Sequence, residues 1–252
     1  MKHTLKYTFS LLFLLVSFTI YSQETVLKDS IATKKDSVVP KKERFGIRFG
    51  VDLFKLTRSF YEKNYRGLEL VADYKLTRKH YIAVELGNEN KTVDDDRINF
   101  TTSGTYIKAG FDYNGYQNWV GMENMIYVGL RYGLSSFSQQ RNSYEIYNTD
   151  TYFGIAPEVI DGEKFSGLSA QWLEVVAGFK AEIYNNLYLG ISLRVNRLFT
   201  NKTPENFDNL YIPGFNRTYN GDFGVGFNYT VSYFLPLYKS TIKAKIKAEK
   251  KK

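Results

Sequence analysis

Cysteine is absent from this 252-residue chain, which excludes disulfides, thiolate metal sites and a lipidated cysteine. Histidine is nearly absent, with only His3 and His80. Long apolar runs are missing outside the N-terminus, so a helical membrane protein, whose spans need about 20 apolar residues, is excluded. A basic face is missing too, because the formal charge of +8 is concentrated in Lys2, Lys6 and the lysine-rich segment from Lys239 to Lys252. Nucleic acid is therefore not an expected partner.

The first residues have the build of a secretory signal. Lys2 and Lys6 precede an apolar run from Leu11 to Ile20, and Ser22 lies at a plausible cleavage site. The following stretch is mixed in charge and poor in aromatics, as flexible segments are. We therefore predict four parts: a signal peptide over 1–22, a flexible periplasmic linker over 23–44, one large domain over 45–238 and a basic periplasmic tail over 239–252.

Apolar and polar residues alternate through the large domain, most clearly from 167 to 199. There Leu173, Val175 and Phe179 share one face, while Glu174 and Lys180 share the other. A period of two predicts β-strands. The predicted strands are 45–54, 67–76, 81–89, 103–113, 123–137, 168–183, 187–199 and 222–235.

The connections between these strands alternate strictly in length. The long ones are 55–66, 90–102, 138–167 and 200–221, and the short ones are 77–80, 114–122 and 184–186. Such alternation predicts an up-and-down antiparallel barrel with tight turns at one end and longer loops at the other, as in outer-membrane barrels. For the hairpin at 184–186, opposed residues must share a face, which predicts a three-residue turn with an asparagine in the left-handed region.

The apolar face of each strand is free of charge over about the nine to eleven positions that a tilted membrane strand requires. Aromatic residues recur near its ends, like the girdles of membrane barrels, at Phe45, Tyr74, Phe111, Tyr113, Tyr132, Phe179 and Phe223. Both features favour an outer-membrane barrel over the alternative, a secreted or periplasmic lipocalin-like barrel whose apolar face lines a ligand cavity.

Glycines and charges share the opposite face, with near-parity between acids and bases. Buried charges require partners, so near-parity permits a structural network inside a narrow lumen. The predicted lumen residues are Arg48, Asp52, Glu69, Asp73, Glu85, Lys108, Asp112, Arg131, Glu174, Lys180, Glu182 and Arg194. A lumen filled in this way makes a narrow pore the less favoured of the remaining alternatives.

The apparent signal, the eight alternating strands and the aromatic last strand GDFGVGFNYTVSYFL together resemble small outer-membrane β-barrel proteins of Bacteroidota. The architecture is similar to the transmembrane domain of the OmpA/OmpX type. The resemblance implies export to the cell outer membrane, contact with outer-membrane lipid and lipopolysaccharide, and assembly by the outer-membrane insertion machinery. Such barrels commonly end on an aromatic residue, whereas here Phe234 is followed by the lysine-rich tail.

Few residues suggest chemistry. His80 falls in a predicted short turn, so we predict no catalytic residue, no cofactor and no enzymatic activity. Asp94-Asp95-Asp96 could supply oxygen ligands to calcium but lacks a glycine-spaced motif, and no metal site is predicted. Arg197 is the one charge on an apolar face, where it either contacts lipopolysaccharide phosphate or extends to water.

The 138–167 loop is the largest candidate binding surface, and its aromatic residues either bind a ligand or pack onto the rim. They are Tyr144, Tyr147, Tyr152, Phe153 and Phe165. We therefore predict a non-enzymatic envelope protein with a structural role or a recognition role through its outer loops.

Overall fold

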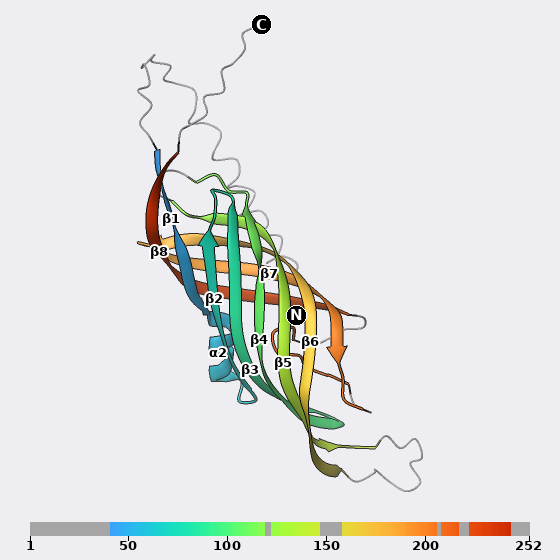
Figure 1. The fold of residues 1–252 in the computed structure, drawn as a ribbon. Helices are drawn as coiled ribbons and strands as arrows, with labels where there is room; N and C mark the ends of the chain where they lie inside the picture. The colour runs from blue at the N-terminus through green and yellow to red at the C-terminus, as the bar shows by residue number, and fades with distance from the viewer. Residues whose placement is uncertain (1–40, 119–121, 147–157, 206–207, 217–221, 243–252) are drawn as a thin grey trace, which may run out of the picture. The chain divides into compact units, whose positions relative to one another are not determined.

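The computed structural model describes residues 41–118, 122–146, 158–205, 208–216 and 222–242. The predicted fold is confirmed: eight antiparallel strands follow one another in chain order around a closed barrel, and β1 pairs with β8 to close it (Figure 1). Closure leaves no free edge along the paired region. The predicted signal peptide and most of the basic tail lie outside the described residues.

The elements have the following bounds: β1 Lys41–Asp52, α2 Leu53–Tyr61, β2 Tyr65–Lys75, β3 His80–Asp95, β4 Ile98–Asn114, β5 Met125–Tyr144, β6 Val159–Tyr184, β7 Leu187–Lys202 and β8 Phe223–Ile242. Pairing of β1 with β8 extends from Lys41 opposite Ile242 to Asp52 opposite Thr230. The strands therefore continue beyond the predicted barrel limits of 45 and 238, because backbone pairing does not require the apolar alternation that defined those limits.

The barrel has two unlike ends. At the end that we call the turn end, β2 connects to β3 through 76–79, β4 to β5 through 115–124 and β6 to β7 through 185–186. At the other, the loop end, lie α2, the tip of the β3–β4 hairpin, the end of β5 and the start of β6, and the described part of the β7–β8 connection (Figure 1). The start of β1 and the end of β8 lie at the turn end.

Two of the predicted long loops are largely strand. The β3–β4 hairpin continues to Asp95 opposite Ile98, where the sequence predicted a loop over 90–102. Strands β5 and β6 likewise pair as far as Tyr144 opposite Val159, inside the predicted 138–167 loop. These extensions carry scattered apolar residues, such as Val93 opposite Phe100, but no regular apolar alternation, although their backbones pair as in the rest of the ladder.

Helix α2 replaces the end of the first predicted strand and most of the predicted 55–66 loop. Asp52 caps it, because its Oδ1 accepts hydrogen bonds from the backbone N–H groups of Phe54 (2.7 Å) and Lys55 (3.4 Å). Glu62 is the C-cap residue. Arg58 and Glu62 then form an ion pair one turn apart.

The β6–β7 turn keeps the predicted pairing of the strands but is shorter than predicted. Glu182 lies opposite Tyr188, as the shared-face rule predicts, but the register shifts between Glu182 and Tyr184 so that Tyr184 lies opposite Leu187. The turn therefore has two residues preceded by a bulge, and the predicted three-residue turn is wrong. Asn186 does adopt the left-handed conformation, with φ of 62°, which asparagine tolerates.

Burial shows which face of each strand is inside. Apolar side chains at alternate strand positions are exposed, including Ile126 (60%), Leu193 (61%) and Val225 (66%). The charged side chains at the positions between them are buried. Phe45 is an exception among the predicted girdle residues: it lies next to a register shift in the β1–β8 pairing, and its ring, stacked on Tyr238 at 5.3 Å between centroids, is 8% exposed. Over the described residues, no helix is long and apolar enough to cross a membrane.

Candidate functional site

The predicted lumen residues line the barrel interior. Ten are buried, namely Arg48, Asp52, Glu69, Asp73, Glu85, Lys108, Asp112, Arg131, Glu174 and Arg194. The other two are half-buried. Lys180 reaches into the interior and contacts Asp73 at 2.5 Å, whereas Glu182 lies at the turn and accepts the backbone N–H of Asn186 at 2.8 Å.

The centre of the lumen is organised around Glu85. Its carboxylate contacts Arg194 at 2.5 Å, Arg131 at 3.4 Å and Lys108 at 3.6 Å. Glu174 shares two of these cations, at 3.1 Å from both Lys108 and Arg194. Because these groups are buried, loss of one carboxylate would leave several cations without compensation.

Toward the turn end a second group of ion pairs fills the lumen. Asp73 lies between Arg48 (3.4 Å) and Lys180 (2.5 Å). Lys75 contacts Glu123 at 2.6 Å, and Arg48 donates to the backbone carbonyl of that glutamate at 3.0 Å. These contacts join β1, β2 and β6 to the β4–β5 turn.

At the loop end, Lys55 of α2 points into the lumen, where its ammonium contacts Glu69 at 2.8 Å and Glu89 at 2.6 Å. Glu89 also accepts hydrogen bonds from the Tyr211 hydroxyl (2.6 Å) and the Gly214 backbone N–H (3.3 Å). The segment 208–216, part of the β7–β8 connection, is therefore bound inside the barrel mouth. We call it the plug segment.

An apolar cluster holds the plug segment in place. Ile212 and Phe215 are fully buried, and the Phe215 ring packs edge-on against Trp172 with 5.8 Å between centroids. Strand residues on the interior parity complete the cluster, namely Tyr106, Phe137, Leu168, Ala170 and Leu198. Beneath the plug segment, a cavity of about 20 Å³ remains beside Lys55 and Arg194, which is on the order of one water molecule.

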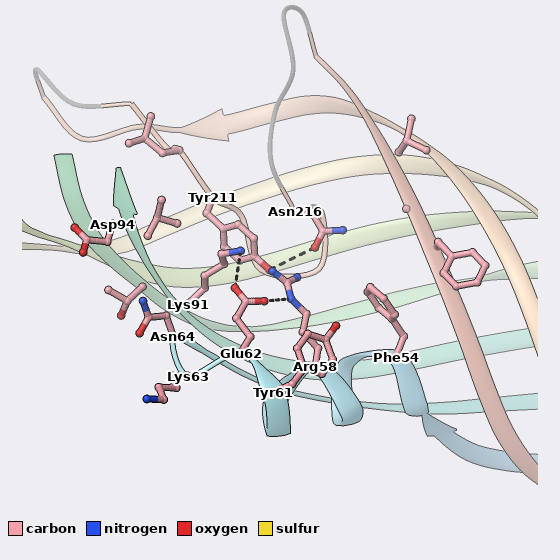
Figure 2. Close-up of a pocket in the computed structure, with 16 residues that line it drawn as sticks. Phe54, Arg58, Tyr61, Glu62, Lys63, Asn64, Lys91, Asp94, Tyr211 and Asn216 are labelled. Carbon is pink, nitrogen blue, oxygen red and sulfur yellow. Dashed lines mark hydrogen bonds and ion pairs between the residues drawn. The ribbon is translucent and has the colours of Figure 1, made fainter. Parts of the chain in front are cut away.

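A pocket of about 720 Å³ opens at the loop end, above the plug segment. Its walls come from α2 and the Lys63-Asn64 turn that follows, the loop-end part of β3, the plug segment and the start of β8. Figure 2 shows the Arg58 guanidinium extending from α2 toward Tyr211 and Asn216, with Glu62 beside it. Glu62 also contacts Lys91 at 3.4 Å.

Charge pairing fixes the protonation of Glu62. The hydrogen bond from Arg58 holds the pKa of this carboxyl below its ordinary value, against a smaller opposing effect of burial. The pocket wall therefore carries an ionised carboxylate that is already matched by two basic side chains.

The remaining sequence candidates are distributed around the barrel. Arg197 is exposed on the outer face near the loop end, with its guanidinium 5.9 Å from the Phe199 ring and 5.6 Å from Phe223. His80 is exposed at the turn end, where its Nδ1 lies 2.9 Å from the Thr77 hydroxyl. Among the described residues, no cluster of three acidic or histidine side chains that could hold a metal ion is found.

The predicted aromatic surface of the 138–167 segment is only partly described. Tyr144 and Phe165 both lie beside Arg141, whose guanidinium is 5.0 Å and 5.7 Å from their ring centroids. Tyr147, Tyr152 and Phe153 lie outside the described residues. None of the described residues of this segment lines the pocket.

Sequence reasoning missed Lys55, Glu89, Arg58 and the plug segment. Two signals were present: a possible helix cap at Asp52 followed by basic and acidic residues four apart, and the apolar run LYIPGF within a connection otherwise read as an outer loop. Neither the helix cap nor the apolar run is part of an alternating strand pattern, so the alternation of apolar and polar residues did not indicate them.

These features define the class of protein: a closed eight-stranded β-barrel with a charged and plugged interior and an apolar exterior. The chain belongs to the family described as Domain of unknown function (DUF6048), whose model matches residues 4–240. No curated protein sequence matches it significantly.

Two solved structures are similar to this chain. One is the crystal structure of Ail, the attachment invasion locus protein of Yersinia pestis, with 10% identity, a TM-score of 0.38 and coverage of 78% of this chain and 99% of Ail. The other is Ail in complex with the heparin analogue sucrose octasulfate, with the same identity and coverage and a TM-score of 0.34. Likeness at this level transfers no function.

Proposed function

We propose that this chain is a non-enzymatic integral barrel of the outer membrane that uses its loop end for recognition at the cell surface. The predicted signal peptide over 1–22 directs its export, and the insertion machinery of the outer membrane assembles it. Lipid and lipopolysaccharide surround the barrel, and Arg197 on the outer face contacts a lipopolysaccharide phosphate.

The sidedness of the strands carries this proposal. Ion pairs fill the interior, whereas side chains such as Phe111 (55% exposed) and Val195 (53% exposed) cover the outside. In water, this arrangement would expose a continuous apolar surface and bury charge, and both cost free energy. In lipid, the apolar surface is solvated, and neighbouring strands pair with one another around a closed ring.

The same observation counts against the lipocalin-like carrier, because an apolar ligand requires an apolar cavity. Here the interior is occupied by groups such as Glu85 and Arg194, which contact each other at 2.5 Å. A narrow pore is also disfavoured, since the plug segment lies in the mouth and buried ion pairs occupy the interior, where the cavity beside Lys55 and Arg194 has a volume of about 20 Å³. We expect no steady single-channel steps in planar bilayers.

The non-enzymatic assignment is supported by the state of the buried carboxylates. Glu85, Glu174 and Asp73 each contact at least two cations. Carboxylates held in this way lack the free access to a substrate that acid–base chemistry requires.

Fractionation of cells that express the full chain tests the proposal. We expect the protein to stay with outer membranes after alkaline carbonate washing, and to migrate differently on a gel when it is not heated. A soluble barrel of the envelope serves as the control. Release by carbonate into the soluble fraction would overturn the proposal.

A further inference from the structure

The loop-end pocket presents one arginine that the protein holds in a fixed orientation. The Nε of Arg58 donates to Glu62, and its guanidinium lies 4.1 Å from the centroid of the Tyr65 ring. These two contacts fix the plane of the guanidinium. The Nη1 and Nη2 groups of Arg58 have no hydrogen-bond partner in the described structure, so the forked donor face of Arg58 is left for the pocket.

The charge of the pocket favours an anion. Its wall includes Arg58, Lys63 and Lys91 against Glu62 and Asp94. Glu62 is already bound by Arg58 and Lys91. A fixed guanidinium with two parallel N–H donors matches the geometry of a phosphate or carboxylate group.

The rest of the wall combines aromatic rings with neutral polar groups. Tyr61 is 69% exposed, and the Phe54 and Phe227 rings meet edge-on with 6.0 Å between centroids. Asn216 adds an amide whose Oδ1 lies 3.4 Å from the Tyr211 hydroxyl. Aromatic surface beside scattered polar groups suits the body of a sugar, which has apolar C–H faces and hydroxyl edges.

We propose that the loop-end pocket binds a saccharide that carries a phosphate or carboxylate group, with Arg58 as the anchor of that group. The volume of about 720 Å³ lies within the range of about 300–1,000 Å³ that small-molecule sites occupy. The ligand chemistry has two sources, a free acidic sugar or the headgroup of lipopolysaccharide. The inference rests on the proposed function in one respect, that the loop end faces the outside.

Calorimetric titration of the full chain, refolded in vesicles free of lipopolysaccharide, tests the site. The probes are glucose 6-phosphate, galacturonic acid and neutral glucose. We expect the two acidic sugars to bind more tightly than glucose. Loss of a charge-assisted bond in Arg58→Gln should weaken their binding by about 10- to 100-fold.

Two further variants keep the test decisive. Asn216→Asp keeps a residue type that tolerates the left-handed backbone at φ of 80°, and it adds a negative charge to the pocket without altering Arg58. It should weaken binding of the acidic sugars too. Arg66→Gln, at an exposed position of β2 that does not line the pocket, is the matched control and should leave binding unchanged.

The outcomes separate the two proposals. Equal affinity for glucose and glucose 6-phosphate, or unchanged affinity in both Arg58→Gln and Asn216→Asp, would overturn the site. The proposed function would still stand if the protein remained a membrane barrel whose gel mobility changes on heating. Titration repeated in vesicles that contain lipopolysaccharide distinguishes the sources: displacement of the sugar identifies the headgroup, and undiminished binding identifies a free acidic sugar.

Discussion

The two ends of the barrel are closed in different ways. In the centre and toward the turn end, the lumen is filled by side chains that alternate along the strands, such as Arg48, Glu85 and Arg194. At the loop end it is filled by segments that leave the strand pattern, namely α2 and the plug segment. Strand alternation therefore encodes the wall and its charged filling, while other segments of the sequence encode closure of the mouth.

The largest effect is expected at the centre. Glu85→Gln removes the carboxylate that three buried cations share, and breaking a buried ion pair costs about 3–5 kcal/mol. Urea unfolding in vesicles, followed by gel mobility, measures the free energy of unfolding. Glu62→Gln is the control at the loop end, where a partly exposed pair contributes about 0–1 kcal/mol. Equal losses of unfolding free energy in the two variants would contradict the expected difference between the charged centre and the loop end.

Phe215→Ala tests closure of the mouth. Removal of a fully buried ring costs about 3 kcal/mol, but we expect the loss to stay local, because Phe215 belongs to the plug segment and not to the strand ladder. Proteolysis of the β7–β8 connection should accelerate while the gel mobility of the unheated barrel is retained. Phe60→Ala, at a ring that is 84% exposed on α2, should change neither. Global unfolding in Phe215→Ala would show that plug and wall form one unit.

The turn end gives a smaller effect. Asn186→Ala keeps a β-carbon in the left-handed region but loses the polar side chain that lets asparagine tolerate it, which costs about 1 kcal/mol, whereas Asn186→Gly removes the β-carbon and relieves that strain. Both variants lose the hydrogen bond that Arg44 donates to Asn186 at 2.8 Å, so their difference isolates the backbone contribution. The urea midpoint should be lower in Asn186→Ala than in Asn186→Gly. The reverse order would contradict the assigned backbone conformation.

The smallest effect concerns pH at the loop end. The pKa of Glu62 is lowered in the folded protein by the hydrogen bond from Arg58, so its contribution is fully present above the unfolded pKa of about 4.5 and is lost as the pH falls through the folded value. Because the Arg58–Glu62 ion pair is partly exposed, its contribution to the free energy of unfolding is about 0–1 kcal/mol. The difference in unfolding free energy between wild type and Glu62→Gln should vanish in acid. A difference that persists there would contradict the pairing.

The sequence predicted the strand number, the order of the barrel and the parity of the interior residues because these features follow from a period of two. Glu85 and Arg194 lie on the lumen side for that reason alone. Strand ends were harder to predict, because polar extensions such as Thr92 opposite Thr101 pair through the backbone without an apolar pattern.

The pocket could not be predicted from alternation, because Arg58 and Asn216 belong to a short helix and to the plug segment. They meet only after the plug segment folds into the barrel mouth, which depends on contacts distant in sequence, such as Tyr211 with Glu89. A connection between strands gives no local signal for such an inward path beyond its apolar content.

Spin labels along β7 test whether the apolar face of the barrel lies against lipid. Because the chain has no cysteine, single cysteines at 191, 192, 193 and 195 can be labelled one at a time in the barrel reconstituted in vesicles. We expect high accessibility to oxygen, which concentrates in lipid, at Ile191, Leu193 and Val195, and low accessibility at Ser192, which is 4% exposed inside the barrel. Strong accessibility of the three odd positions to a water-soluble nickel reagent would contradict it.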